Sequence, residues 1–294
     1  MQIESETYRH ANLGIDLKKY PIDNLNTPEA RELIERSRKA LKETGCASYP
    51  GFLTEEATRI CAHEAAIKSE HAFVTDKGHT AFQRPADSSE PRANHVRNTF
   101  MSTQVASTAY DELDTKGALR KLYESDSLLH FVNAVIGRDN STEPLYHLSD
   151  QLGACSINVF REGWSHAWHF DESEFTTTLS LQTAERGGVF EYTNRLRDTQ
   201  EMSEDVDKQV AAVLNKHSKF KVEPVDADTK VPEIYTAPFE PGTLQIFAGR
   251  YSFHRVTETE GERERLVAVM CFADKPGKCN SKEVQEMFWG RTYQ

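Results

Sequence analysis

Two histidines and an aspartate stand in a pattern that can hold a metal ion. His169 and Asp171 are separated by one residue, and His254 follows far downstream. Residues i and i+2 of a strand point to the same face, so His169 and Asp171 can bind one ion together. Two imidazoles and one carboxylate are the ligands of non-haem Fe(II) sites that keep positions open for other molecules. The spacing therefore predicts an Fe(II) site formed by His169, Asp171 and His254.

A buried arginine after the second histidine extends this prediction. Arg265 begins the apolar run 266–270, and a buried cation is costly without an anion. A guanidinium binds a carboxylate through two parallel hydrogen bonds, so the distal carboxylate of 2-oxoglutarate is a suitable partner. This favours iron over zinc, whose catalytic sites combine similar ligands with a water. If the strand register differs, Arg263 takes the role instead.

The residue pattern in the second half of the chain predicts mainly short strands. Apolar residues alternate or cluster at 154–160, 174–182, 189–192, 233–237, 243–247 and 266–272. A helical insert follows Ser203, with its apolar residues on one face. Many short strands around such an insert predict an α+β fold with a double-stranded β-helix, or jelly-roll, core over residues 151–275.

The first half is expected to be rich in helix. Thr27 and Pro28 begin one helix that should stop near Gly45, and a strand is expected at 46–52. Helices are expected from Thr54 to about 71 and over 113–137, with a break at residue 125 or 127. Residues 74–97 are expected to form a loose segment without regular secondary structure. Residues 1–150 should pack on the β-helix core, followed by a C-terminal tail over 276–294, so that 1–294 forms a single domain.

At this point the motifs resemble a known superfamily. The His-x-Asp, His and Arg pattern over about residues 150–275 resembles the Fe(II)/2-oxoglutarate-dependent dioxygenases. The segment 168–175, followed by Gly187-Gly188 and by residues 190–192, is similar to the freestanding amino-acid halogenases and their hydroxylase relatives, the BesD/HalD group. The resemblance implies Fe(II), 2-oxoglutarate as co-substrate and O₂.

The resemblance gives Asp171 a specific meaning. In halogenating members a small residue, usually glycine, replaces this carboxylate and chloride occupies the vacated position. The presence of Asp171 therefore implies hydroxylation of a C–H bond, with desaturation left open.

Four residues are candidates for substrate binding in an amino-acid-directed member. His166 and Glu172 flank the ligand pair, Trp289 can supply an aromatic wall, and Arg97 can bind a carboxylate. Each also has a simpler structural explanation: His166 can orient a ligand, Glu172 can be solvated, Arg97 lies in an expected loop, and Trp289 can be a packing anchor.

Composition limits the other functional classes. A net charge of −11 without a basic run argues against nucleic acid and anionic membranes as partners. The acidic residues 1–6 do not resemble the beginning of a secretory signal. No run of apolar residues is long enough to predict a membrane-spanning helix. Five scattered cysteines favour a reducing, cytoplasmic compartment. Two alternatives to a 2-oxoglutarate hydroxylase remain: a metal-dependent cupin-type oxygenase or isomerase, and a non-catalytic metal-binding β-helix module. The oligomeric state is not predicted.

Overall fold

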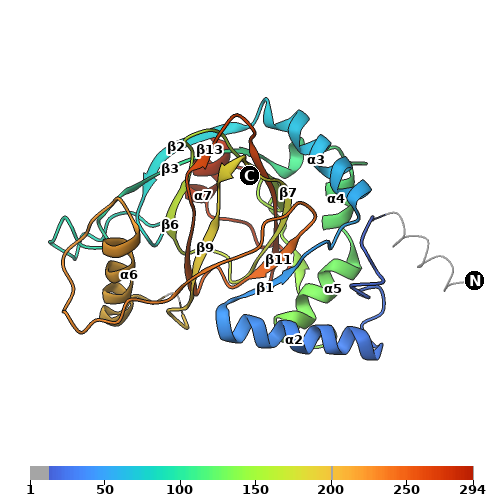
Figure 1. The fold of residues 1–294 in the computed structure, drawn as a ribbon, viewed down its shortest axis with the longest axis horizontal. Helices are drawn as coiled ribbons and strands as arrows, with labels where there is room; N and C mark the ends of the chain where they lie inside the picture. Colours follow the sequence, from blue (N-terminus) through green and yellow to red (C-terminus); the bar gives the residue numbers. More distant parts are fainter. Residues whose placement is uncertain (1–12, 200, 294) are drawn as a thin grey trace, which may run out of the picture.

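Two antiparallel sheets form the centre of the computed structural model, which describes residues 13–199 and 201–293 (Figure 1). The acidic start 1–6 lies outside the described residues. In the large sheet the strand order is β1-β11-β7-β14-β5-β3-β2, and β4 pairs with β14. The strands are β1 (Cys46–Tyr49), β2 (Phe73–His79), β3 (Met101–Thr108), β4 (Tyr146–His147), β5 (Cys155–Phe160), β7 (Thr176–Gln182), β11 (Leu244–Phe247) and β14 (Arg265–Ala273).

The small sheet carries the predicted metal ligands. Its order is β10-β9-β12-β6, formed by β6 (His166–His169), β9 (Phe190–Arg195), β10 (Ile234–Thr236) and β12 (Ser252–Val256). A separate pair joins β8 (Arg186–Gly187) to β13 (Thr259–Glu260). Residues of both larger sheets line one shared cavity, so the sheets face each other. This is the expected double-stranded β-helix.

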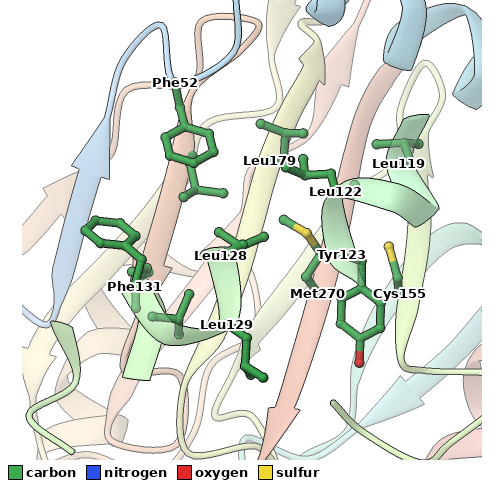
Figure 2. Close-up of a cluster of buried hydrophobic side chains, with 14 of the residues drawn as sticks. Phe52, Leu119, Leu122, Tyr123, Leu128, Leu129, Phe131, Cys155, Leu179 and Met270 are labelled. Atoms are coloured by element: carbon green, nitrogen blue, oxygen red, sulfur yellow. The ribbon is translucent and has the colours of Figure 1, made fainter. Parts of the chain in front are cut away.

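Most helices cover one side of the large sheet. They are α2 (Pro28–Thr44), α3 (Glu55–Ser69), the 3₁₀ turn η1 (Tyr110–Glu112), α4 (Ala118–Tyr123) and α5 (Asp126–Val135). Figure 2 shows side chains of α4 and α5, such as Leu122 and Leu128, packed near Leu179 and Met270 of the sheet. Burial of this apolar surface fixes the sheet face that is turned away from the cavity.

Local signals explain where the predicted helices begin and end. The Thr27 hydroxyl accepts from the Ala30 amide at 3.2 Å, and Gly45 ends α2 with a φ of 86°. The helical insert is α6 (Glu204–His217), where the Ser203 hydroxyl accepts from the Val206 amide at 3.3 Å. In Figure 1, α6 lies at the opposite end of the molecule from α3 and α4.

One expectation about organisation is corrected. The segment 74–97 is not uniformly loose, because its start belongs to β2, which pairs along its length with β3. The strand expected at 46–52 is present as β1, and β2 and β3 add two further strands of the first 150 residues to the large sheet. The tail 276–294 contains α7 (Lys282–Trp289), capped by Ser281. Among the described residues, no helix has the length and apolar character needed to cross a bilayer.

Candidate active site

The structure brings the three predicted ligands together. His169 ends β6, and its register partner on the neighbouring strand β12 is His254. Oδ1 of Asp171 lies 3.4 Å from His169 Nε2 and 3.3 Å from His254 Nε2. These three ligand atoms lie within 4.8 Å of one another, which is close enough to hold one metal ion. Both histidines are buried, with 3% and 4% of their surface exposed.

The outer nitrogens of both imidazoles are held by the backbone. Nδ1 of His169 is 2.8 Å from the Ala167 carbonyl, and Nδ1 of His254 is 2.9 Å from the Ser252 carbonyl. A carbonyl can only accept, so each ring carries its proton on Nδ1 and presents the Nε2 lone pair to the centre. Such outer contacts commonly orient metal-bound histidines. The donor set therefore fits a divalent iron ion.

The carboxylate of Asp171 is equally constrained. Its Oδ2 accepts from the Thr176 hydroxyl at 2.7 Å, and its amide donates to the Gly249 carbonyl at 3.0 Å. A Cβ at Gly249 would fall 2.0 Å from Oδ2, so only glycine fits there. Burial raises the pKa of Asp171, but when the rings are protonated, their positive charges and hydrogen bonds, those of His254 first, hold it well below its usual range. The carboxylate is ionised, as a metal ligand requires.

Arg265 is a buried cation at the start of β14. It is 3% exposed, and its Nε donates to the Gly188 carbonyl at 2.9 Å. Its guanidinium lies 3.7 Å from the ring centre of Phe239 and 5.1 Å from that of Phe160. Burial lowers its pKa to about 9. Within residues 13–199 and 201–293 no carboxylate forms an ion pair with it, so an anionic ligand would relieve the cost of its burial.

The alternative residue Arg263 lies elsewhere. It is exposed, and its Nε and Nη2 donate to the carbonyls of Thr183 and Ala184 at 2.8 and 3.1 Å. It does not line the cavity that contains the three ligands. Of the two arginines, only Arg265 is placed to meet a ligand there.

The ligands and Arg265 line one cavity of about 170 Å³. A buried water needs roughly 10–15 Å³ of such space, so about 11–17 waters would fit. Val267, Val269 and Cys271 also line it, because alternate residues of β14 share the face of Arg265.

Three of the four candidate substrate residues border the same cavity. His166, Glu172 and Trp289 all line it. His166 stacks on His169 with ring centres 3.8 Å apart, which brings it beside the metal site. Its Nε2 and the Nε1 of Trp289 are buried and have no hydrogen-bond partner among the described residues. A polar ligand in the cavity could satisfy both.

Arg97 is the exception. Its Nε and Nη2 donate to Asp207 of α6 at 2.9 and 2.6 Å, and its Nη1 is 3.2 Å from Asp87. It does not line the cavity. The expected contact with a substrate carboxylate is therefore corrected: Arg97 ties the loop before β3 to α6.

Several residues around the site were not among the predicted site residues. Thr176 binds the Asp171 carboxylate, and Gly188 and Phe239 hold Arg265. His79 of β2 lies 5.7 Å from the His169 ring, and its Nε2 is 2.7 Å from the Thr103 hydroxyl. A signal for Thr176 is its place at the start of the strand after the ligand pair. The others depend on contacts between segments distant in sequence.

Comparisons with known proteins agree with this geometry. A family model described as Halogenase D matches residues 29–290. Among curated proteins no match was found. Similar solved structures include the α-ketoglutarate-dependent epimerase SnoN from nogalamycin biosynthesis, at 14% identity and a TM-score of 0.53, covering 83% of each chain. AviO1 from Streptomyces viridochromogenes has 12% identity and a TM-score of 0.52, covering 83% of this chain and 96% of its own.

A third similar structure is a prolyl hydroxylase from Trichoplax adhaerens, at 11% identity and a TM-score of 0.50, covering 85% of this chain and 94% of its own. At these identities the three structures establish the fold. The family model covers most of the chain and therefore establishes the family. The protein belongs to the halogenase D family.

Proposed function

We propose that this protein is an Fe(II)- and 2-oxoglutarate-dependent hydroxylase of a free amino acid or a similar small polar molecule. In the reaction an unactivated C–H bond becomes C–OH, while 2-oxoglutarate and O₂ yield succinate and CO₂. We further propose that residues 1–294 form one domain. The observation that carries the proposal is the Asp171 carboxylate, 3.4 and 3.3 Å from the two imidazoles.

Each residue has a proposed role. His169, Asp171 and His254 would hold Fe(II), which supplies activation of O₂ when bound. Arg265 would bind the distal carboxylate of 2-oxoglutarate through its Nη groups, because its Nε is already engaged by Gly188. Asp171 would occupy the coordination position that a halide needs, which favours hydroxylation over halogenation. His166, Glu172 and Trp289 would contact the substrate.

The setting of the reaction is also a proposal. All five cysteines are free, which supports a reducing compartment such as the cytoplasm. The partner would be a small molecule, since the cavity is of matching size. Nothing in the charge balance favours nucleic acid as a partner.

A panel of free amino acids tests the function. The iron-loaded protein is incubated with 2-oxoglutarate, O₂ and chloride, and succinate and the amino-acid products are measured by mass spectrometry. The proposal expects one amino acid to increase succinate formation and to gain oxygen without gaining chlorine. A chlorinated product would contradict it. Oxidation that does not consume 2-oxoglutarate would favour a cupin-type oxygenase, and metal binding without turnover a non-catalytic module.

A further inference from the structure

A buried histidine outside the cavity lies against the proposed metal site. His79 ends β2, is 5% exposed and does not line the cavity. Its ring is nearly perpendicular to the rings of His166 and His169, whose centres are 5.4 and 5.7 Å away. Edge-to-face packing of this kind favours a particular orientation of neighbouring rings. His79 can therefore act on a metal ligand without reaching the cavity itself.

Both ring nitrogens of His79 are hydrogen-bonded to the protein. Nδ1 is 2.9 Å from the Thr80 carbonyl, and Nε2 is 2.7 Å from the Thr103 hydroxyl. Burial lowers the pKa of His79 to about 3, so the ring is neutral and carries one proton. Because a carbonyl can only accept, that proton lies on Nδ1. Nε2 is then the acceptor, and the Thr103 hydroxyl is its donor.

The Thr103 hydroxyl continues this chain of hydrogen bonds to β6. Its oxygen accepts from the Ala167 amide at 3.0 Å, which leaves the hydroxyl proton free to point at His79. The Ala167 carbonyl in turn accepts from Nδ1 of His169 at 2.8 Å. On the other side of that ring, Nε2 faces Oδ1 of Asp171 at the proposed metal position. A continuous chain thus joins His79 to a metal ligand.

The strand register places the members of this chain. His79 pairs with Met101 in the ladder of β2 and β3, so Thr103 is its diagonal neighbour on the same face. Next to Thr103, the Gln104 amide donates to the Ser165 carbonyl at 2.9 Å, which brings β3 to the start of β6. β2 and β3 belong to the large sheet and β6 to the small sheet (Figure 1). The chain therefore joins the two sheets at the strand that carries the first metal ligand.

The second histidine ligand is held differently. Nδ1 of His254 is 2.9 Å from the Ser252 carbonyl. The Ser252 amide donates to the Ala248 carbonyl at 3.0 Å, within the same segment, and its buried hydroxyl has no hydrogen-bond partner among the described residues. Both imidazoles are thus bonded to a carbonyl at Nδ1, but within the described part of the chain only His169 is linked onward to another histidine. His254 is a built-in comparison for any effect of His79.

The direction of the hydrogen bonds gives His79 its effect. Every donor in the chain points from the metal position toward His79. Hydrogen bonds that share a direction in a low-dielectric interior strengthen one another. An acceptor at the far end therefore supports the Nδ1 bond of His169. A firm bond at Nδ1 fixes the tautomer and the rotation of a ligand imidazole and makes its Nε2 a better donor to a metal.

We propose that His79 is a positioning residue of the metal site, which fixes the ring of His169 through Thr103 and the backbone of Ala167. This inference rests on the proposed function, because it concerns how one ligand of the proposed iron site is held. His79 touches neither the metal position nor the substrate. Its contribution is to the affinity for Fe(II) and to the order of the His169 ring, whatever the substrate is.

Two variants of His79 separate its hydrogen bonds from its shape. His79→Phe keeps an aromatic ring but removes the acceptor for Thr103. Anaerobic calorimetry should show Fe(II) affinity lowered about three- to tenfold, less than for contacts that bond directly to a ligand. His79→Gln can place its amide oxygen where Nε2 stood, and it should restore most of the affinity. Thr103→Val breaks the same chain, so combining it with His79→Phe should lower the affinity no further than Thr103→Val alone.

A matched control separates this effect from a general loss of stability. His147→Phe removes another histidine that is bonded to the protein, since its Nε2 is 2.8 Å from the Tyr123 carbonyl. His147 neither lines the cavity nor belongs to the chain of hydrogen bonds. It should leave Fe(II) affinity unchanged. Equal affinities in the unaltered protein and in His79→Phe would overturn the proposal, as would an equal loss in His147→Phe.

The metal-free protein offers a second, independent measurement. Nuclear magnetic resonance of isotope-labelled histidine should place the protons of His169 and His254 on Nδ1. In His79→Phe the His169 proton should exchange faster with solvent, and the His254 proton should not. If neither rate changes, or both change equally, His79 does not position His169. If the unaltered protein binds no Fe(II), the proposed function fails, and the exchange rates still decide the role of His79.

Discussion

The hydroxyl of Thr176 donates to Oδ2 of Asp171 at 2.7 Å, while Oδ1 of the same carboxylate faces both imidazoles. One oxygen is thus held by the protein and the other is presented to the metal position. This division fixes the rotation of the carboxylate without occupying its metal-facing oxygen. Outer contacts of this kind typically tune metal affinity.

Removing the Thr176 hydroxyl should weaken metal binding. Thr176→Val keeps the shape but deletes the donor, and we expect Fe(II) affinity to fall about 10- to 100-fold. Thr176→Ser keeps the donor and should remain close to the unaltered protein. Anaerobic titration with Fe(II), monitored by calorimetry, measures the Fe(II) affinity of both variants. Equal affinity for the Val and Ser variants would show that this hydrogen bond does not matter.

Replacing the carboxylate itself should change the chemistry. Asp171→Gly removes one ligand and opens a position beside the two histidines. Hydroxylation should fall strongly, and a halide position should become available in the presence of chloride. Mass spectrometry of the amino-acid product distinguishes the outcomes by the chlorine isotope pattern. Hydroxylation at an unchanged rate would mean that Asp171 is not a metal ligand.

The buried carboxylate of Asp150 should hold the wall of the cavity in place. It is fully buried, and its Oδ1 accepts from the amides of Leu152 and Gly153 at 2.8 and 3.1 Å. Its Oδ2 accepts from the Asn280 amide at 2.8 Å and from Gln285 of α7 at 2.9 Å. In Asp150→Asn the new side-chain NH₂ group would face N–H groups that now donate to the carboxylate. The lost hydrogen bonds should lower the free energy of unfolding by about 1–3 kcal/mol.

Chemical denaturation and tryptophan quenching measure this effect. Loosening of α7 should make Trp289, which is 8% exposed, more accessible to a quencher. Asp274→Asn is the control, since its pair with Lys278 is solvent-exposed and should contribute at most about 1 kcal/mol. If the two variants are equally stable, Asp150 does not anchor α7.

The sequence predicted the parts of the site that follow from local spacing. His169 and Asp171 share a strand face, and Arg265 opens an apolar strand, so their common cavity follows from the alternation of side chains. Helix ends were predictable where a cap is local, as at Thr27 and Ser203. In these cases the interactions that determine the structure join residues close together in the sequence.

The rest depends on contacts between distant segments. The edge strand β2 exposes Asp76 and Lys77, so its sequence lacks a buried alternation, and only its pairing with β3 makes it a strand. Arg97 could not be excluded from the site without seeing Asp207 of α6 beside it.

The central claim is that Arg265 and the three ligands bind 2-oxoglutarate on Fe(II). Without O₂, titration of the Fe(II)-loaded protein with 2-oxoglutarate should produce a weak metal-to-ligand charge-transfer band in the visible spectrum. Arg265→Gln removes the buried cation, so the same band should require at least about tenfold more 2-oxoglutarate. A saturable band with this shift is the predicted result. Folded, iron-loaded protein that gives no band at any 2-oxoglutarate concentration would contradict the account.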